Sequence, residues 1–315
     1  MSLQIELYSK LYMARRAELA IQKYYHENDM KTPMHMSYGQ EIAPVGVCQA
    51  LTKEDQVFGT YRSHALYLAK SGNLVKFFGE MYGKVTGIVN GKGGSMHLSD
   101  SEMGYMGASA VVAASIPPAV GAAFAQKYKN TGHIVAPFFG DGASDEGDFW
   151  ESVNIATSKR LPILFVLEHN GLAVNTPPSM RQGYDSIVEI MKQYRFACVS
   201  EFNAVYTPNV EFVYSYTYET IRQMKLMGRP GFFCIHVERG LQHIGIKPDY
   251  DGIRRIKPDA DDNVEFYRNI VLQTQSKSAV EKIESDIDER VEDAIRQAKA
   301  AAFPDTSELY EGVFA

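Results

Sequence analysis

The sequence contains little cysteine and no excess of basic residues, and these two shortages exclude several classes of protein. Only three of its 315 residues are cysteines, Cys48, Cys198 and Cys234, and they are far apart and without a C-x-x-C spacing. Such a set forms neither a disulfide framework nor a zinc knuckle and is typical of free thiols in a reducing cytosol. Lysine and arginine number 32 against 38 aspartates and glutamates, a formal net charge of -6. This balance provides no broad basic surface, so nucleic acid is not expected as a partner.

Long hydrophobic runs of the kind that cross membranes are also lacking. The first residues carry no basic stretch followed by an apolar run, so the sequence does not predict a secretory signal. One uncharged stretch, residues 103–126, is long enough to span a bilayer, but its middle holds Pro117 and Pro118 and it is rich in glycine and alanine. We therefore expect a small-residue helix, buried within the protein or against a partner subunit. The protein is predicted to be cytoplasmic and to have no contact with membranes.

Short apolar segments alternate with helical patterns along most of the chain. Apolar stretches without polar alternation, separated by helices, are typical of a mostly parallel sheet with helices on both faces. With 45% hydrophobic and 22% charged residues, the chain can bury such a core. We predict one α/β domain over residues 1–315, with helical extensions at both ends. The predicted strands are 134–139, 163–167, 197–206 and 232–237, and the predicted helices include 116–129, 145–158, 210–227 and 278–302, besides one near the start.

A glycine-flanked aspartate stands where the predicted strand 134–139 ends and the next helix begins. Gly140 and Gly142 allow the backbone on both sides of Asp141 to turn sharply and approach an anion. Open parallel sheets bind ligands at this edge, where free N–H groups of the next helix can face phosphate. A carboxylate beside phosphate is repelled unless a cation lies between them. The pattern therefore indicates Mg²⁺ or Ca²⁺ between Asp141 and a diphosphate.

The next predicted strand brings a second candidate ligand to the same edge of the sheet. It ends in residues 167–172, Leu-Glu-His-Asn-Gly-Leu, which places Asn170 near Asp141. An amide oxygen is a hard, neutral ligand for such a cation, and the backbone carbonyl of Leu172 can add another oxygen. A Gly-Asp-Gly turn is common by itself, and it is the pairing with Asn170 that makes it informative.

The combination of residues 140–142 with Asn170 resembles the signature of thiamine-diphosphate-dependent enzymes. Further motifs are similar to one branch of them, the alpha subunits of the decarboxylating component of 2-oxo acid dehydrogenase complexes, of the pyruvate and acetoin dehydrogenase type. The resemblance runs from about Ser37 to His243, and several separate motifs in the right order argue against chance. These motifs are residues 39–41, 60–64, 91–98, 142–143, 151–156 and 161–162, together with Arg239 and His243.

The resemblance implies the thiamine-diphosphate-binding fold, as its diphosphate-binding domain, and it implies roles for individual residues. Asp141, Asn170 and the Leu172 carbonyl would hold Mg²⁺. Gly142 and Ala143 would offer backbone N–H groups to the diphosphate. The other implied cofactor-binding residues are Tyr61, Arg62, Ala110, Val112, Arg239 and His243. Arginine suits this role because its guanidinium matches phosphate oxygens.

The implied reaction is oxidative decarboxylation of a 2-oxo acid or related ketone, with transfer of the acyl group to lipoamide on a lipoyl acyltransferase. In this family a beta subunit contributes the pyrimidine-binding domain and the glutamate that activates the cofactor, in an α2β2 heterotetramer. Within this chain, His64 and His243 are our candidates for proton transfer near the substrate, because histidine titrates near neutrality.

Departures from the family pattern leave other functions open. His169 stands where the family usually has asparagine, and Leu172 where it has tyrosine. The segment 244–249 lacks both serines of a loop that, in the family, orders over the cofactor and receives the lipoyl arm. One alternative is therefore a non-oxidative decarboxylase or carboligase, or half of a split transketolase. Another, of a different class, is a cofactor-binding scaffold subunit without catalysis.

Overall fold

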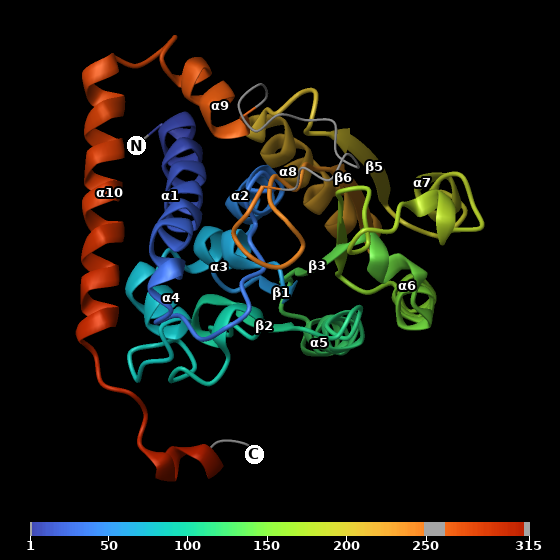
Figure 1. The fold of residues 1–315 in the computed structure, drawn as a ribbon. Coiled ribbons are helices and arrows are strands. Elements are labelled where there is room, and N and C mark those ends of the chain that lie inside the picture. Colours follow the sequence, from blue (N-terminus) through green and yellow to red (C-terminus); the bar gives the residue numbers. More distant parts are fainter. Residues whose placement is uncertain (1, 249–261, 312–315) are drawn as a thin grey trace.

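Six parallel strands form the central sheet of the computed structural model, which describes residues 2–248 and 262–311 (Figure 1). Their spatial order is β2-β1-β3-β4-β6-β5. Because every neighbouring pair is parallel, the carboxyl ends of all described strands lie at one edge of the sheet. The strands are β1 (Gln56–Thr60), β2 (Tyr105–Ser109), β3 (Val135–Gly140), β4 (Leu164–His169), β5 (Cys198–Asn203) and β6 (Gly231–His236).

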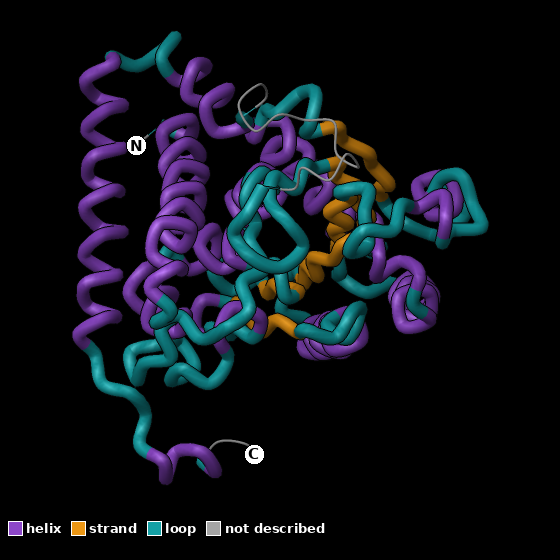
Figure 2. The backbone as a smooth tube through the Cα atoms, in the orientation of Figure 1, coloured by secondary structure: helices purple, strands orange, loops and turns teal. Residues whose placement is uncertain are grey.

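Helices cover both faces of this sheet, as Figure 2 shows by the purple helices around the orange strands. Successive side chains of β4 point to opposite faces, so Val166 joins one hydrophobic cluster while Phe165 and Leu167 join the other. The first cluster includes residues of α1 (Leu3–Tyr24), α2 (Ile42–Ala50), α3 (His64–Ser71), α4 (Leu74–Met81), α8 (Val210–Met227), α9 (Asn263–Val271) and α10 (Lys277–Ala300). The second includes residues of α5 (Ile116–Lys129), α6 (Gly147–Lys159) and α7 (Ile187–Met191). The predicted α/β fold, with helices on both faces, is confirmed.

The long helices α1 and α10 lie side by side and run in the same direction (Figure 1). Arg16 pairs with Asp288 at 2.6 Å, and Lys23 pairs with Glu292 at 2.8 Å. The second pair lies further along both helices, as it does in a parallel pair. The apolar stripe predicted for 278–302 is the buried face of α10, which ends shortly before Pro304. The two helical extensions therefore form one layer.

Most predicted elements occur close to their predicted bounds, and two of the predicted helices, now α5 and α8, coincide with the prediction. Helix α6 begins two residues later than predicted, because a 3-10 turn, η4 (Asp141–Asp145), separates it from β3. Strands β1 and β2 were not predicted. Both are short and contain glycine, Gly59 in β1 and Gly107 in β2, so neither has a continuous apolar run.

The uncharged stretch 103–126 is not a single helix, which corrects the prediction. It forms β2, a turn and then most of α5, with Pro117 and Pro118 in the first helical turn, where proline costs no hydrogen bond. Nor is the whole stretch buried within this chain, since Val111 is 68% and Phe124 52% exposed. Among the described residues, no helix is long and apolar enough to cross a membrane.

Candidate cofactor site

A cavity of about 250 Å³ lies at the carboxyl ends of β1, β3 and β4. The chain passes from β1 to β2 on one side and then crosses back to β3 on the other, so β1 and β3 flank the point where the strand order reverses. Ligands of open α/β sheets bind at such a point. Most of the predicted site residues line this cavity: Tyr61, Arg62, Val112, Asp141, Gly142, Ala143, Asn170, Leu172, Arg239 and His243.

The three predicted metal ligands form one wall of the cavity. Asp141 is the first residue after β3 and is 1% exposed, and Asn170 directly follows β4. Two hydrogen bonds hold the Asn170 amide in place. Its Nδ2 donates to Gln40 Oε1 at 3.2 Å, and its Oδ1 accepts from the Leu172 N–H at 3.2 Å. A carboxylate, an amide oxygen and a nearby backbone carbonyl are the ligand types that a hard divalent cation prefers.

Arg181 contacts the Asp141 carboxylate, and the sequence alone did not single it out. Its guanidinium donates to the carboxylates of Asp141 and Asp145, and its Nη1 also lies 3.2 Å from the backbone oxygen of Asp141. A carboxylate as buried as that of Asp141 requires a positively charged partner. In this structure the guanidinium is that partner, which shows that the position suits a cation. The donor set around Asp141 therefore fits Mg²⁺.

Two more arginines reach the cavity from other directions, both held by backbone carbonyls. Arg62 donates from Nη1 to Met36 O at 2.8 Å and from Nη2 to His243 O at 3.0 Å. Arg239, 1% exposed, donates to Leu241 O at 3.1 Å and to Val174 O at 3.2 Å. Both guanidinium groups are therefore held in fixed positions beside the cavity, where positive charge favours an anionic ligand.

His243 is placed by the same contacts. Arg62 Nη2 lies 3.2 Å from His243 Nδ1 and donates to the His243 backbone oxygen at 3.0 Å. The ring also packs against Tyr61, at 5.5 Å between centroids, and edge-on against His35 at 5.3 Å. His243 therefore lines the cavity with its ring held in a defined position.

His64 and Ala110 do not belong to the described lining of the cavity. The His64 ring is fully buried, with Nδ1 3.0 Å from Glu18 Oε1 and Nε2 2.8 Å from Ser95 Oγ. Both nitrogens are thus engaged inside the protein. This geometry lends no support to the predicted proton-transfer role of His64 and indicates a structural one.

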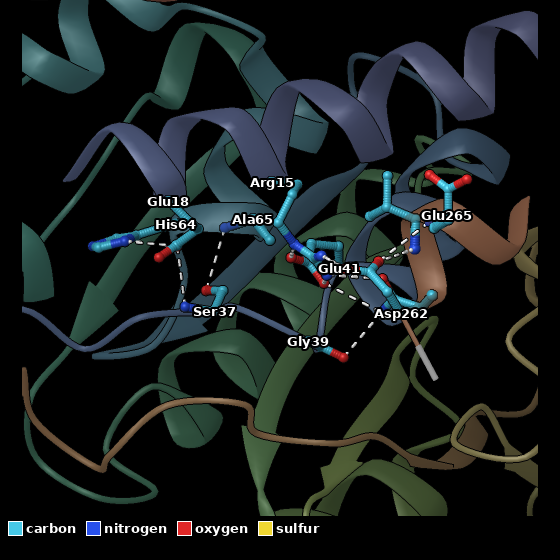
Figure 3. Close-up of polar contacts among 11 residues, drawn as sticks. Arg15, Glu18, Ser37, Gly39, Glu41, His64, Ala65, Asp262 and Glu265 are labelled. Atoms are coloured by element: carbon cyan, nitrogen blue, oxygen red, sulfur yellow. Dashed lines mark hydrogen bonds and ion pairs between the residues drawn. The ribbon is translucent and has the colours of Figure 1, made fainter. Parts of the chain in front are cut away.

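A buried ionic network supports the segment that carries Gln40, as Figure 3 shows. Arg15 of α1 forms a 2.7 Å ion pair with Glu41 and a 3.1 Å hydrogen bond with Asn263 Oδ1, and it also pairs with Asp262. Asn263 in turn donates to the backbone oxygen of Gly39 at 3.0 Å. The network therefore joins α1, the start of α2 and the start of α9 around residues 39–41, whose Gln40 contacts Asn170.

Two residues that line the cavity have strained backbones. Ala113 and Val174 both line it, and both have left-handed backbone conformations, with φ of 62° and 56°. This conformation is uncommon for residues other than glycine and is a clear outlier for a β-branched residue such as Val174. Strain of this kind, about 1–3 kcal/mol per residue, is found preferentially at ligand sites.

Burial shifts the pKa of two groups, one that lines the cavity and one that lies behind its lining. Glu168, at the end of β4, lines it, and burial raises the pKa of this carboxyl to about 8, partly opposed by the Arg62 charge. His35 lies behind Tyr61, and burial, together with the Arg62 charge, lowers the pKa of its imidazole to about 4. At neutral pH the His35 ring is therefore uncharged.

Replacing His35 with phenylalanine is expected to reduce the loss of folding stability as the pH falls below about 6.5. A histidine whose folded-state pKa lies below its unfolded value of about 6.5 disfavours folding increasingly as the pH falls from 6.5 to 4. The loss from this one group is of the order of 2–3 kcal/mol. Urea unfolding of both proteins between pH 7 and 4 measures the difference. Equal pH dependence in the two proteins would contradict the assignment.

Comparison with known proteins agrees with this geometry. Residues 9–199, more than half of the chain, match the family described as "Dehydrogenase E1 component". Two similar proteins are acetoin:2,6-dichlorophenolindophenol oxidoreductase alpha subunits. The one from Bacillus subtilis (strain 168) is 29% identical over 98% of this chain and 92% of its own length. The one from Cupriavidus necator is 31% identical over 98% of this chain and 93% of its own length.

A third similar protein is the mitochondrial pyruvate dehydrogenase E1 component subunit alpha-1 of Oryza sativa subsp. japonica. It is 29% identical over 95% of this chain and 77% of its own length. These matches extend well beyond the motifs at the cavity, across nearly the whole sequence. The predicted family is confirmed: the chain belongs to the dehydrogenase E1 component family and is an oxidoreductase subunit of a thiamine-diphosphate-dependent 2-oxo acid dehydrogenase.

Proposed function

We propose that this chain is the alpha subunit of an α2β2 dehydrogenase and that its cavity binds the diphosphate of thiamine diphosphate through Mg²⁺. The observation that carries the proposal is the convergence of Asp141, Asn170 and Arg62 on one cavity at the reversal of strand order. Asp141, Asn170 and the Leu172 carbonyl would hold the cation. Arg62, like Arg239, would neutralise the phosphates, and Gly142 and Ala143 would present backbone N–H groups.

The bound cofactor would supply the electron sink for cleavage of the bond next to the substrate carbonyl. The chain's own contribution would be position, charge and protons. Fixed guanidiniums at Arg62 and Arg239 orient the diphosphate end. His243 is the candidate for proton transfer at the substrate side of the cavity.

A partner subunit would complete the site. The cavity measures about 250 Å³, below the roughly 300–1,000 Å³ of pockets that enclose a whole ligand. Next to it, Val111 and Val112 are exposed, and α5 presents an exposed uncharged face. The residues of this face recur at helical spacing: Pro117, Gly121, Phe124 and Tyr128. We propose that this surface packs against the beta subunit, which brings the pyrimidine-binding domain.

Two substrate classes are supported to different degrees. Family membership favours a small 2-oxo acid, with lipoamide of an acyltransferase as acyl acceptor. Acetoin is the second candidate, because the two acetoin oxidoreductase subunits match over 92% and 93% of their own length, against 77% for the rice pyruvate dehydrogenase subunit. Either substrate carries a carbonyl beside the bond to be cleaved.

Co-expression with the cognate beta subunit tests this function. The purified complex is screened with pyruvate, branched 2-oxo acids and acetoin in the presence of thiamine diphosphate, Mg²⁺ and an artificial electron acceptor. Substrate-dependent reduction of the acceptor supports the proposal, and added lipoamide identifies the acyl acceptor. Carboligation without oxidation would favour the non-oxidative alternative. Failure to bind thiamine diphosphate in the complex would favour the scaffold subunit.

Replacing Arg181 with glutamine is expected to strengthen the binding of Mg²⁺ with thiamine diphosphate several-fold. Arg181 and the metal compete for the same carboxylate, so removing the guanidinium leaves Asp141 available. Titration of Mg²⁺ at fixed thiamine diphosphate in the assembled complex measures the change. Arg195→Gln, at an exposed position, is the control. Weaker binding by the Arg181 variant would mean that this arginine binds the cofactor instead.

A further inference from the structure

A second cluster of metal-binding side chain types lies at the carboxyl ends of β4, β6 and β5. Cys234 and His236 are two residues apart on β6 and therefore point to the same face of the sheet. The strand register places His169 of β4 directly opposite His236, and Glu201 of β5 directly opposite Cys234. The parallel register thus gathers one thiol, two imidazoles and one carboxylate on one face.

Three of these groups are already within coordination distance of one another. Glu201 Oε1 lies 2.7 Å from His236 Nε2, and Cys234 Sγ lies 3.8 Å from the same nitrogen. The ligand atoms of Glu201, Cys234 and His236 all lie within 4.8 Å of one another. His169 is adjacent, with its ring centroid 4.8 Å from that of His236.

The cluster borders a cavity of its own. This cavity has a volume of about 260 Å³ and is lined by all four residues of the cluster and by Asp185 from the loop before α7. It shares no lining residue with the cofactor cavity among the described residues. His169 and Asn170 are neighbours in sequence, but they line different cavities.

The spacing suits a tetrahedral transition-metal ion. With Zn–S and Zn–N bonds of about 2.3 and 2.0 Å, a tetrahedral site places sulfur and nitrogen roughly 3.5 Å apart. The observed 3.8 Å between Cys234 and His236 is close to this value. The Glu201 oxygen must move away from His236 by about half an ångström for the same geometry. It is free to do so because the Glu201 side chain is 50% exposed.

We propose that Glu201, Cys234 and His236 bind a divalent transition-metal ion of the Zn²⁺ class, with His169 as the nearest further ligand. A thiolate, an imidazole and a carboxylate form a borderline-soft donor set, which selects Zn²⁺ over Mg²⁺ and Ca²⁺. On binding, the Cys234 proton is released to solvent and the sulfur bonds to the metal. The proposal does not depend on the function proposed for the cofactor cavity.

Cobalt substitution tests this site on the full chain, purified with its partner subunit. Co²⁺ is added in the presence of excess Mg²⁺, which occupies oxygen-only sites. We expect about one Co²⁺ per chain with a thiolate-to-cobalt charge-transfer band in the near ultraviolet, and removal of the band by Zn²⁺. Cys234→Ser should lose the band and bind Zn²⁺ at least about tenfold more weakly in chelator competition. His236→Gln should also bind Zn²⁺ more weakly.

Cys198→Ser is the matched control, because it removes one thiol from the neighbouring strand β5 and leaves the cluster intact. It should keep both the band and the Zn²⁺ affinity. Circular dichroism confirms that each variant is folded. If Cys234→Ser does not fold, His236→Gln decides by its Zn²⁺ affinity. Absence of the band in the unsubstituted protein, its persistence in Cys234→Ser, or unchanged Zn²⁺ affinity in His236→Gln would overturn the proposal.

Discussion

Replacing Asp141 with alanine is expected to abolish the binding of thiamine diphosphate with Mg²⁺ to the assembled enzyme. Asp141 is the one charged group among the three proposed metal ligands, and it is 1% exposed, so a neutral water in its place would not supply the lost charge. Removing a group that only orients a metal ligand already lowers metal affinity by about 10- to 100-fold. Loss of the charged ligand itself should cost about 100-fold or more. Isothermal titration calorimetry measures the effect.

The control for this experiment is Asp148→Ala. Asp148 is an exposed acidic residue in the first turn of α6, close in sequence and of the same charge, but outside the cavity lining. We expect its affinity for the cofactor to be nearly unchanged. Unaltered binding by the Asp141 variant would refute the metal assignment. Equal losses in both variants would mean that net charge near α6, and not coordination, determines affinity.

The second large effect is expected on stability. Glu41→Ala should lower the free energy of unfolding by about 3–5 kcal/mol, because it leaves the buried Arg15 guanidinium without its fully buried partner. The remaining ion pair with Asp262 is more exposed and does not replace it. Equilibrium urea unfolding measures the change. Because Gln40 contacts Asn170, the variant should also bind the cofactor more weakly.

Two further variants test whether the stability loss comes from an uncompensated buried charge. Lys23→Ala removes an exposed ion pair between α1 and α10 and should change stability little. The double variant Arg15→Met with Glu41→Leu removes both buried charges and should recover much of the stability lost in Glu41→Ala. A double variant as unstable as the single one would show that the charges themselves, and not an uncompensated arginine, determine the loss.

The cofactor cavity could be predicted from sequence where its residues follow strands. Asp141 and Asn170 each stand directly after an apolar segment, and parallel strands bring such positions to one edge. Arg181 could not be predicted in this way. It comes from an irregular segment 40 residues after Asp141, and no motif or periodicity marks it. A long side chain on a loop can point in many directions. Only the folded backbone determines that the Arg181 side chain points toward Asp141.

His64 shows a different limit. It belongs to a motif, residues 60–64, whose Tyr61 and Arg62 do line the cavity. A motif gives the position of a residue in the chain but not the direction of its side chain. His64 is the first residue of α3, and in the folded protein its ring points inward to Glu18 and Ser95. Strands β1 and β2, each with one glycine, were missed for a simpler reason. Pairing with their neighbours, and not their own composition, makes them strands.

The pairing of α1 with α10 has a consequence for how the protein folds during synthesis. Tyr8 and Glu284, which hydrogen-bond across the two helices, are 276 residues apart in sequence. Helix α1 therefore leaves the ribosome long before α10, the helix that covers it. Likewise, Arg15 cannot form its hydrogen bond with Asn263 until that residue has been synthesised. Such high sequence separation slows the closing steps of folding. The apolar residues of α1 that contact α10 remain uncovered until α10 has been synthesised, and until then they are accessible to chaperones.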